Sequence, residues 1–313
     1  MEGLTKAERQ DLDLRIYLTS TNVSHISPLQ QSIGHLVDRI FTAQDVTSVV
    51  EHTFLDELAR NERNIHKAGL DYAYALQACH ENSASPYIAI LEDDVLLADG
   101  WLARTRLAVR EIEERVGERW QDLRLFNQTR SLGWGSRRIL SKDALILITI
   151  ICAIIVGGTF LHKRYGRRRV LAIPTIIVLC FATVPSFVIL FFQAGKASIL
   201  PPRPGISVQT WGPCVQGNVF ARNHLPGLIQ AIRENAAHRP HDLILRDYAA
   251  WRGLTRYVLT PSQIQHMGFE SVVSVSRPRA EFPWSVAYED LQAEHLAAEH
   301  VEMVRQVYNI GQT

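Results

Sequence analysis

The chain has little net charge, few cysteines and no apolar segment at its amino terminus. Lysine and arginine number 33 against 32 aspartates and glutamates, so a formal net charge of +1 gives no reason to expect nucleic acid as a partner. The opening MEGLTKAERQDLDLR has no apolar core of the kind that a secretory signal peptide needs. Neither a bulk electrostatic partner nor an amino-terminal anchor is therefore expected from these residues.

Long apolar runs are instead concentrated in the middle of the chain. Residues 144–161 (ALILITIICAIIVGGTFL) and 170–192 (VLAIPTIIVLCFATVPSFVILFF) contain no charged side chain. At about 1.5 Å of rise per residue, a helix of either length reaches roughly the 30 Å of a bilayer's hydrocarbon core. A pair of buried core helices is the alternative, but neither run has a polar face. The pattern predicts a transmembrane hairpin over residues 144–195.

The short loop between the runs indicates the orientation of the hairpin. Residues 162–169 (HKRYGRRR) hold five basic side chains, and such short basic loops remain in the cytoplasm. Both flanking segments are then expected on the lumenal side of the membrane. The glycosylation sequons at Asn22 and Asn127 fall in that lumenal part and are consistent with this topology.

A lumenal amino-terminal half raises two further expectations. The amino-terminal half needs a signal that directs it across the membrane. We therefore expect either an upstream anchor in a longer form of the chain or the reverse orientation, and we favour the anchor. Cys152 and Cys180 lie within the apolar runs, whereas Cys79 and Cys214 lie outside them. An oxidising lumen would allow a disulfide between Cys79 and Cys214, which we state as a hypothesis.

Periodicity predicts an α/β arrangement before the hairpin. We expect a strand at residues 14–18, a helix over 55–79, an apolar strand at 87–91 and a helix over 101–114. After the hairpin, residues 288–306 are typical of an amphipathic helix without chemistry of its own.

Three adjacent carboxylates follow the apolar strand YIAIL, namely Glu92, Asp93 and Asp94. In open α/β sheets ligands collect at the carboxyl ends of strands. Oxygen ligands suit Mn²⁺ or Mg²⁺, which bind a few protein carboxylates together with the phosphates of a nucleotide. The alternative is a solvated acidic turn that caps the next helix.

The surrounding motifs resemble those of a known family. YIAILEDDVLLADGW is similar to the EDD version of the DxD motif of GT-A glycosyltransferases. Together with DYAYALQACHENSASPY, the hairpin, PCVQGNVFARNHLPGLI and HDLILRDYAAWRGLTRYVLTPSQIQHMG, it resembles the post-GPI-attachment N-acetylgalactosamine transferases of the Golgi. The resemblance covers residues 55–268 and implies a divergent or truncated member. It also implies a GT-A domain split into residues 1–139 and 200–313 by the hairpin.

The resemblance implies a reaction and roles for particular residues. The reaction is transfer of N-acetylgalactosamine from UDP-GalNAc to the first mannose of a GPI glycan, with Mn²⁺ as metal and GPI-anchored proteins as acceptors. Glu92 and Asp93 match the donor-binding EDD motif, and Asp94 with Asp93 is expected to bind the metal. Gly217 matches a segment that approaches the donor sugar, where a missing Cβ permits close contact.

The QHxG element and the catalytic base complete the expected site. Gln265, His266 and Gly268 match this element. His266 is either a metal or diphosphate ligand or a hydrogen-bonded structural histidine, and we favour the second role. Asp242 is our candidate for the general base that an inverting transfer needs, with Asp247 as its competitor. Asp242 could instead be the N-cap of a helix.

A second function class remains open at this stage. Only LRIYLTS is available as a first nucleotide-binding strand. A catalytically weak relative that binds GPI-anchored proteins or scaffolds Golgi enzymes is therefore the alternative to an active transferase. A transporter or channel is disfavoured because the two spans hold no ionisable residue that would mark a conduction path.

Overall fold

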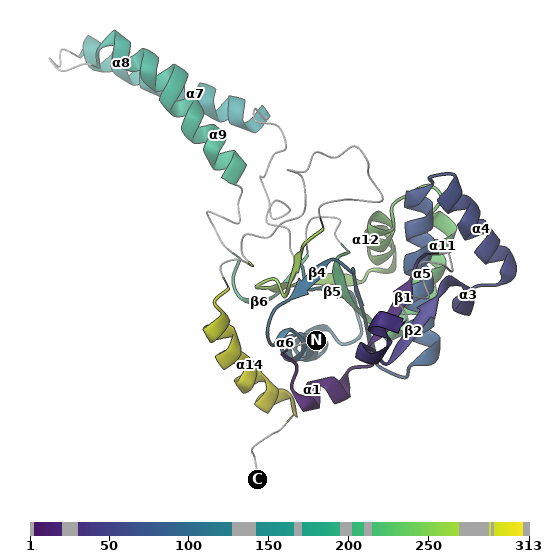
Figure 1. Cartoon of the computed structure of the whole chain (residues 1–313). Coiled ribbons are helices and arrows are strands. Elements are labelled where there is room, and N and C mark those ends of the chain that lie inside the picture. Colours follow the sequence, from purple (N-terminus) through teal and green to yellow (C-terminus); the bar gives the residue numbers. More distant parts are fainter. Residues whose placement is uncertain are drawn as a thin grey trace. The chain divides into compact units, whose positions relative to one another are not determined.

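The chain forms two compact units in the computed structural model (Figure 1). One unit combines Met1–Asn127 with Pro204–Thr313, and the other is Gln128–Arg203. The first has mixed helix and sheet, and the second is helical. The residues that the structure describes are 3–20, 31–126, 142–165, 171–194, 202–209, 215–268, 288 and 291–308.

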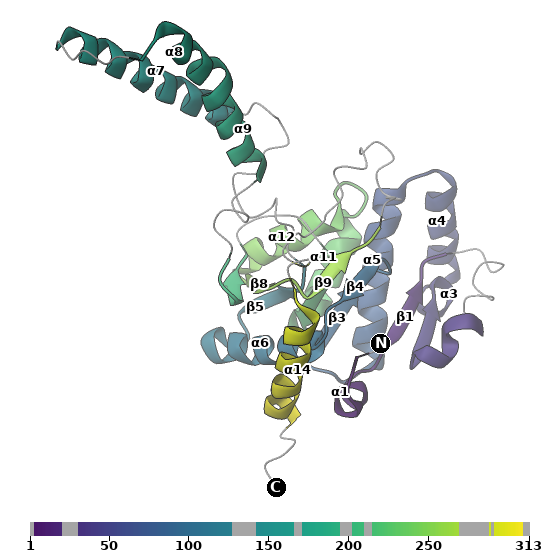
Figure 2. The ribbon, with the colours of Figure 1, turned by 60° about the vertical axis from the view of Figure 1, so that its left-hand side comes forward.

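A five-stranded mixed sheet organises the first unit (Figure 2). In spatial order its strands are β3 (Tyr87–Leu91), β7 (Gly217–Ala221), β5 (Trp120–Arg124), β8 (Thr255–Thr260) and β6 (Gly205–Val208). Strand β7 is antiparallel to both β3 and β5, β5 is parallel to β8, and β6 is antiparallel to β8. Strands β3, β5 and β8 therefore run in one direction and end at the same edge of the sheet.

Helices cover both faces of this sheet. One face packs on α6 (Trp101–Val116), and the other on α5 (Asn64–Asn82), α11 (Leu225–Asn235) and α12 (His241–Arg252). Alternation along each strand divides the core, because successive side chains point to opposite faces. On β7, Val219 joins the α6 core, whereas the next residue, Phe220, joins the core beneath α5, α11 and α12. The α/β class expected from the sequence is confirmed.

Two terminal helices pack beside α6. The first is α1 (Lys6–Asp11), opened by a capping box between Thr5 and Glu8. The second is α14 (Ala293–Tyr308), which contributes Met303 to a small core with α6. A buried hydrogen bond of 2.8 Å between Glu8 and His300 joins the two helices. The expected carboxyl-terminal helix is therefore present, with its start at Ala293.

A separate parallel pair of strands lies near the amino terminus, β1 (Arg15–Leu18) and β2 (Arg39–Thr42). The sequence predicted the first strand but not the second, because RIFT is too short to show an alternating pattern. Arg15 donates to the carbonyl of Asn82 at 2.6 Å, and Lys67 donates to that of Thr19 at 2.7 Å. Both bonds attach β1 to α5. The short helices η1 (Gly34–Leu36) and α3 (Ala43–Val46) precede and follow β2.

The single helix expected over residues 55–79 is wrong in its extent. Two helices occupy this part of the chain, α4 (Val49–Arg60) and α5. Glu62 between them has a φ of 53°, in the left-handed region where a helix cannot continue. No glycine or proline marks this break, so the sequence concealed it. The strand at residues 87–91 and the helix beginning near Trp101 are confirmed as β3 and α6.

The second unit is a pair of exposed apolar helical segments. Helix α7 (Lys142–Arg164) has 23 residues, and α8 (Ile173–Val178), η3 (Leu179–Thr183) and α9 (Val184–Ala194) form the other segment. The mean hydropathies are 2.7 and 2.5, and only 6% of each apolar window is buried. Both segments are long and apolar enough to cross a bilayer, and their exposure differs from that of a soluble core helix.

A π-helical turn, η3, interrupts the second apolar segment. Pro185 has no N–H to donate to the carbonyl one turn before it, so the regular ladder cannot continue through this position. The helical backbone nevertheless continues through Pro185 to Ala194, as membrane helices allow where neighbouring groups satisfy the freed carbonyl. The sequons at Asn22 and Asn127, Cys214 and residues 166–169 of the basic loop lie outside the described residues. Cys79, the other half of the proposed disulfide, is a free thiol in the described part of the chain.

The sheet also carries a buried cluster of polar side chains on its α5 and α12 face. Asp122 on β5 is fully buried and forms a two-point ion pair with Arg256 on β8, at 2.6 and 2.8 Å. Asn218 on β7 donates to the same carboxylate at 2.7 Å. Burying a carboxylate is costly unless its oxygens are paired in this way. These contacts tie three neighbouring strands together at one carboxylate.

We expect Asp122→Ala to destabilise the folded protein by about 3–5 kcal/mol, because it leaves the Arg256 guanidinium buried without its partner. Thermal unfolding of the purified chain in detergent measures the change. The control is Glu111→Ala, which removes an exposed helical ion pair with Arg115 and should cost about 0–1 kcal/mol. Equal effects of the two variants would contradict a central role for Asp122.

Candidate metal centre

The acidic loop after β3 is held against the carboxyl-terminal half of the chain. Glu92 donates its backbone N–H to the carbonyl of Gln216 at 3.0 Å, and Asp94 accepts at its carbonyl from the N–H of Met267 at 2.7 Å. The next strand, β4 (Val95–Leu97), pairs with β9 (Ile264–His266) in antiparallel register. This pairing places the EDD loop beside the QHMG element.

Three side chains converge at this junction. His266 Nε2 lies 3.1 Å from Asp94 Oδ2 and 3.5 Å from Glu92 Oε2. The ligand atoms of the three residues all lie within 4.8 Å of one another. Ligands on opposite sides of one divalent cation are separated by about 4–5 Å, twice the usual metal–oxygen distance. The spacing therefore suits a single shared cation.

The burial of these side chains also fits a cation. Only 11% of the His266 side chain is exposed, whereas about a third of each carboxylate is, at 36% for Glu92 and 34% for Asp94. The imidazole thus closes one side of the site and leaves the other open to water and a ligand. Asp94 Oδ1 and His266 Nδ1 are buried without a hydrogen-bond partner among the described residues. Two carboxylates and an imidazole form a donor set that Mn²⁺ accepts readily, whereas Mg²⁺ prefers oxygen alone.

Glu92 carries the clearest electrostatic signature of the site. Burial, with smaller contributions from the negative charges of Asp94 and Asp93, raises the pKa of Glu92 to about 7. At neutral pH the carboxyl group is therefore divided between its protonated and ionised forms. A bound cation would favour the ionised form and release the proton.

Gly268 leaves the space that the Asp94 carboxylate occupies. A Cβ at this position would lie 1.9 Å from Asp94 Oδ2 and 3.1 Å from His266 Cε1. No side chain can be accommodated there without moving the carboxylate or the backbone. The position of the Asp94 carboxylate thus explains why a glycine occupies residue 268 of the QHMG element.

The other residues expected near the donor lie differently. Asp93 is exposed and outside the three-residue cluster, although it was expected to bind the metal. Gln265 is buried on β9 opposite Leu96. Gly217 faces the core, where a Cβ would meet Ile264 Cδ1 at 2.4 Å. Core packing is sufficient to explain that glycine, and its approach to a donor sugar stays a prediction.

Asp242 lies in the first turn of α12, whose N-cap is Pro240. The N-cap role considered for Asp242 is therefore wrong by two positions. Its Oδ1 accepts from the N–H of Leu243 at 2.7 Å, and its charge helps to raise the pKa of Arg256. Among the described residues no hydrogen bond or ion pair joins Asp242 to the metal cluster.

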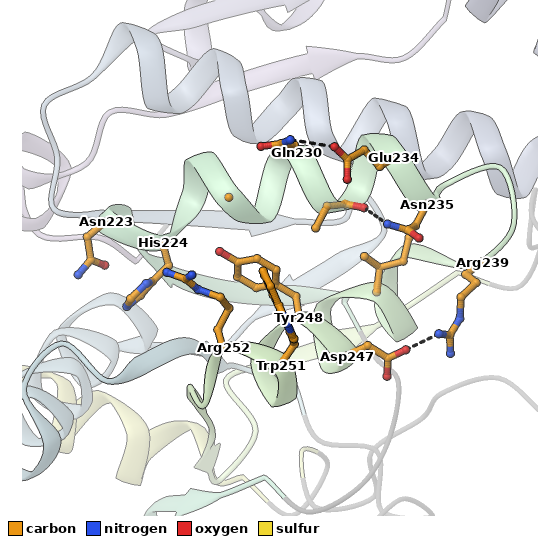
Figure 3. A pocket seen from close by; sticks show the side chains of 13 residues that line it. Asn223, His224, Gln230, Glu234, Asn235, Arg239, Asp247, Tyr248, Trp251 and Arg252 are labelled. Atoms are coloured by element: carbon orange, nitrogen blue, oxygen red, sulfur yellow. Dashed lines mark hydrogen bonds and ion pairs between the residues drawn. The ribbon is translucent and has the colours of Figure 1, made fainter.

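Asp247 lies farther along α12, in a groove between this helix and α11 (Figure 3). Its carboxylate forms ion pairs with Arg239 at 2.5 Å and with Arg246 at 2.9 Å. Both carboxylate oxygens are therefore engaged by guanidinium groups, which leaves less of this side chain available to contact a substrate. The role of either carboxylate as general base stays a prediction.

The sequence did not identify the polar residues that lie behind the metal cluster. Burial raises the pKa of Tyr72 on α5 well above its usual range, and the charges of Asp122 and Glu92 act in the same direction. Tyr72 stacks on His241 with ring centroids 4.7 Å apart, and its hydroxyl is buried without a partner in the described chain. The sequence signal for these buried polar residues is the alternation of charged and apolar residues in QDLRL, where Asp122 and Arg124 occupy one face of a buried strand.

Comparison of the chain with models of protein families, with curated proteins and with solved structures finds no match. The geometry of the three converging side chains therefore carries the functional argument.

The raised pKa of Glu92 predicts how stability depends on pH. The folded state holds this proton up to about pH 7, whereas the unfolded chain loses it near the ordinary value of 4.5, so the stabilising contribution of the protonated form is lost as the pH rises toward 7. We expect the metal-free melting temperature to fall between about pH 5 and about pH 8, less so in Glu92→Gln. Added Mn²⁺ should restore stability at the higher pH in the unmodified chain only. An identical pH profile for Glu92→Gln would contradict this account, and Glu111→Gln is the exposed control.

Gly268→Ala should weaken binding of Mn²⁺ by about 10–100-fold, the range typical of changes that misplace a metal ligand. The added methyl group would displace the Asp94 carboxylate. Electron paramagnetic resonance of free Mn²⁺ during a titration measures the affinity. Gly158→Ala is the matched control, because a Cβ there meets no atom within 4 Å. Unchanged Mn²⁺ affinity in Gly268→Ala would rule out Asp94 as a ligand.

Proposed function

We propose that this chain is a metal-dependent glycosyltransferase of the GT-A type. The proposed reaction moves N-acetylgalactosamine from UDP-GalNAc to the mannose core of GPI glycans. The observation that carries the proposal is the convergence of Glu92, Asp94 and His266 within 4.8 Å, at the end of β3. These residues come from the two motifs, EDD and QHMG, that resemble elements of the same transferase family.

The three converging side chains would hold Mn²⁺, or Mg²⁺, at the open edge of the sheet. Such an ion supplies Lewis acidity that stabilises the diphosphate leaving group. Glu92 would give up its proton as the site fills, since its pKa lies near 7 in the absence of metal. His266 would then be a ligand, contrary to the structural role that the sequence favoured.

Proton transfer from the acceptor hydroxyl needs a carboxylate that can accept a proton. Asp242 is the proposed base because its side chain is only partly buried and its single described bond is to the Leu243 N–H. Asp247 is the weaker candidate because two arginines pair with it.

The helical hairpin supports a location in a membrane. Both segments are long enough to cross a bilayer, and only 6% of each apolar window is buried within the folded chain. Lipid is the solvent that such a surface needs. We propose the Golgi membrane, with the loop of residues 162–169 in the cytoplasm and both halves of the sheet domain in the lumen, where GPI-anchored proteins are available as acceptors.

One observation favours the alternative of a catalytically weak GPI-binding or scaffolding protein. The parallel pair β1 and β2 forms a sheet of its own rather than extending the five-stranded sheet in the described part of the chain. In a single large sheet, the donor nucleotide could bind along one continuous edge of strand ends. The separate pair of β1 and β2 shortens that edge. Donor binding is therefore the decisive measurement.

The test is calorimetric titration of the detergent-purified chain with UDP-GalNAc, with and without Mn²⁺, and with UDP-glucose as a competing donor. We expect binding that requires Mn²⁺ and is abolished in Asp94→Asn, because this carboxylate faces His266. Asp93→Asn is the matched control and should bind at least several-fold more tightly than Asp94→Asn, since Asp93 lies outside the cluster.

The outcomes separate the two functions. Absence of donor binding by well-folded protein would exclude catalysis and favour the scaffolding protein. Donor binding of equal strength with and without metal would exclude the role of the cluster.

A further inference from the structure

An open groove of about 540 Å³ lies between α11 and α12 (Figure 3). Its volume falls within the range of sites that bind small molecules. None of its lining residues belongs to the proposed metal cluster. A ligand in the groove would therefore contact side chains other than the proposed metal ligands.

Two aromatic rings form an apolar wall of this groove. Trp251 is 77% exposed, an unusual state for the largest apolar side chain. Its ring lies 6.2 Å from that of the buried Tyr248, at an interplanar angle of 57°. Gly227 on α11 permits this arrangement, because a Cβ there would lie 2.4 Å from the Tyr248 hydroxyl oxygen. The Arg252 guanidinium lies over the Trp251 ring, 5.7 Å from its centroid, and the wall offers the remaining exposed surface of the indole beside the Tyr248 ring.

Planar polar side chains surround the aromatic wall. The groove includes the amides of Asn223, Gln230 and Asn235. Each donates one hydrogen bond within the chain, to Glu118, to Glu234 and to the carbonyl of Ala231 respectively, and each also carries a second N–H and an acceptor oxygen. Two carboxylates, Glu234 and Asp247, are balanced in charge by two arginines, Arg239 and Arg252. Asp247 and Arg239, which both line the groove, form an ion pair, drawn as a dashed line in Figure 3.

We propose that this groove binds a neutral pyranose unit of a glycan. A pyranose ring has an apolar face of C–H groups, which fits an exposed indole, and a rim of hydroxyls that both donate and accept hydrogen bonds. Planar amide, carboxylate and guanidinium groups can each form two hydrogen bonds with adjacent hydroxyls of that rim. The balance of two positive and two negative side chains disfavours a phosphate or a nucleotide, which needs an excess of positive charge.

The inference does not rest on the proposed transferase activity. Binding at this groove requires no metal, so its test is carried out in the presence of a chelator. Failure of sugar binding would leave the metal centre untouched, and failure of the metal centre would leave this groove untouched.

The experiment is saturation-transfer NMR on the full chain in detergent, with the methyl glycosides of mannose, galactose, N-acetylgalactosamine and N-acetylglucosamine as probes. In parallel, the indole N–H resonance of Trp251 is followed in ¹⁵N-tryptophan protein and assigned by its loss in Trp251→Ala. We expect at least one glycoside to receive saturation and to shift this resonance. Trp251→Ala should weaken that binding by roughly tenfold or more, as expected for loss of a stacking face, and Trp251→Phe by less.

The matched control is Phe54→Ala, which removes another exposed aromatic ring, one on α4 and 42% exposed. Its glycoside binding should equal that of the unmodified chain. Binding of every glycoside undiminished in Trp251→Ala, or no binding by any of them, would overturn the proposal. A shift of the Trp251 resonance by uridine monophosphate but by no glycoside would also overturn it, since the groove would then be a nucleotide site.

Discussion

The pairing of strands across the inserted hairpin is the constraint on which the rest of the structure depends. Strands β3 and β5 come before the hairpin, whereas β7, β8 and β6 come after it. They alternate in the sheet, so β7 lies between the two early strands and β5 lies between two late ones. Neither half of the chain can complete this sheet without the other. The insertion therefore interrupts the sequence of the sheet domain without dividing its core.

The same pairing explains the charged groups that the domain tolerates in its interior. Asp122 is buried only because Arg256 and Asn218 reach it from the two neighbouring strands, both of which belong to the later half. At the sheet edge, the described neighbours of Glu92 are the carboxylates of Asp93 and Asp94 and, at 3.5 Å, the imidazole of His266, and the pKa of Glu92 rises to about 7. Asp122 is thus paired within the sheet, whereas Glu92, with about a third of its side chain exposed, belongs to the cluster where we propose that a cation binds.

Several elements could be predicted because their causes are local. Two uncharged runs long enough to cross a bilayer predict two long apolar helices, and the structure contains both. The strand YIAIL and the helix after Gly100 were predicted for similar reasons, and Gly100 takes the left-handed conformation that a glycine adopts readily. The break at Glu62 and the strand β2 were missed, because neither has a glycine, a proline or a periodic pattern to mark it.

The sequence by itself determined the apolar hairpin, the acidic turn after β3 and the α/β character of the flanking segments, since each follows from residues that are adjacent in the chain. Only the tertiary structure decided which acidic side chains meet His266. Pairing of β4 with β9 selects Glu92 and Asp94 and leaves Asp93 exposed, a choice that three consecutive carboxylates do not reveal. The reason is physical: alternate side chains around a turn point in different directions, and a partner distant in sequence determines which of them face inward.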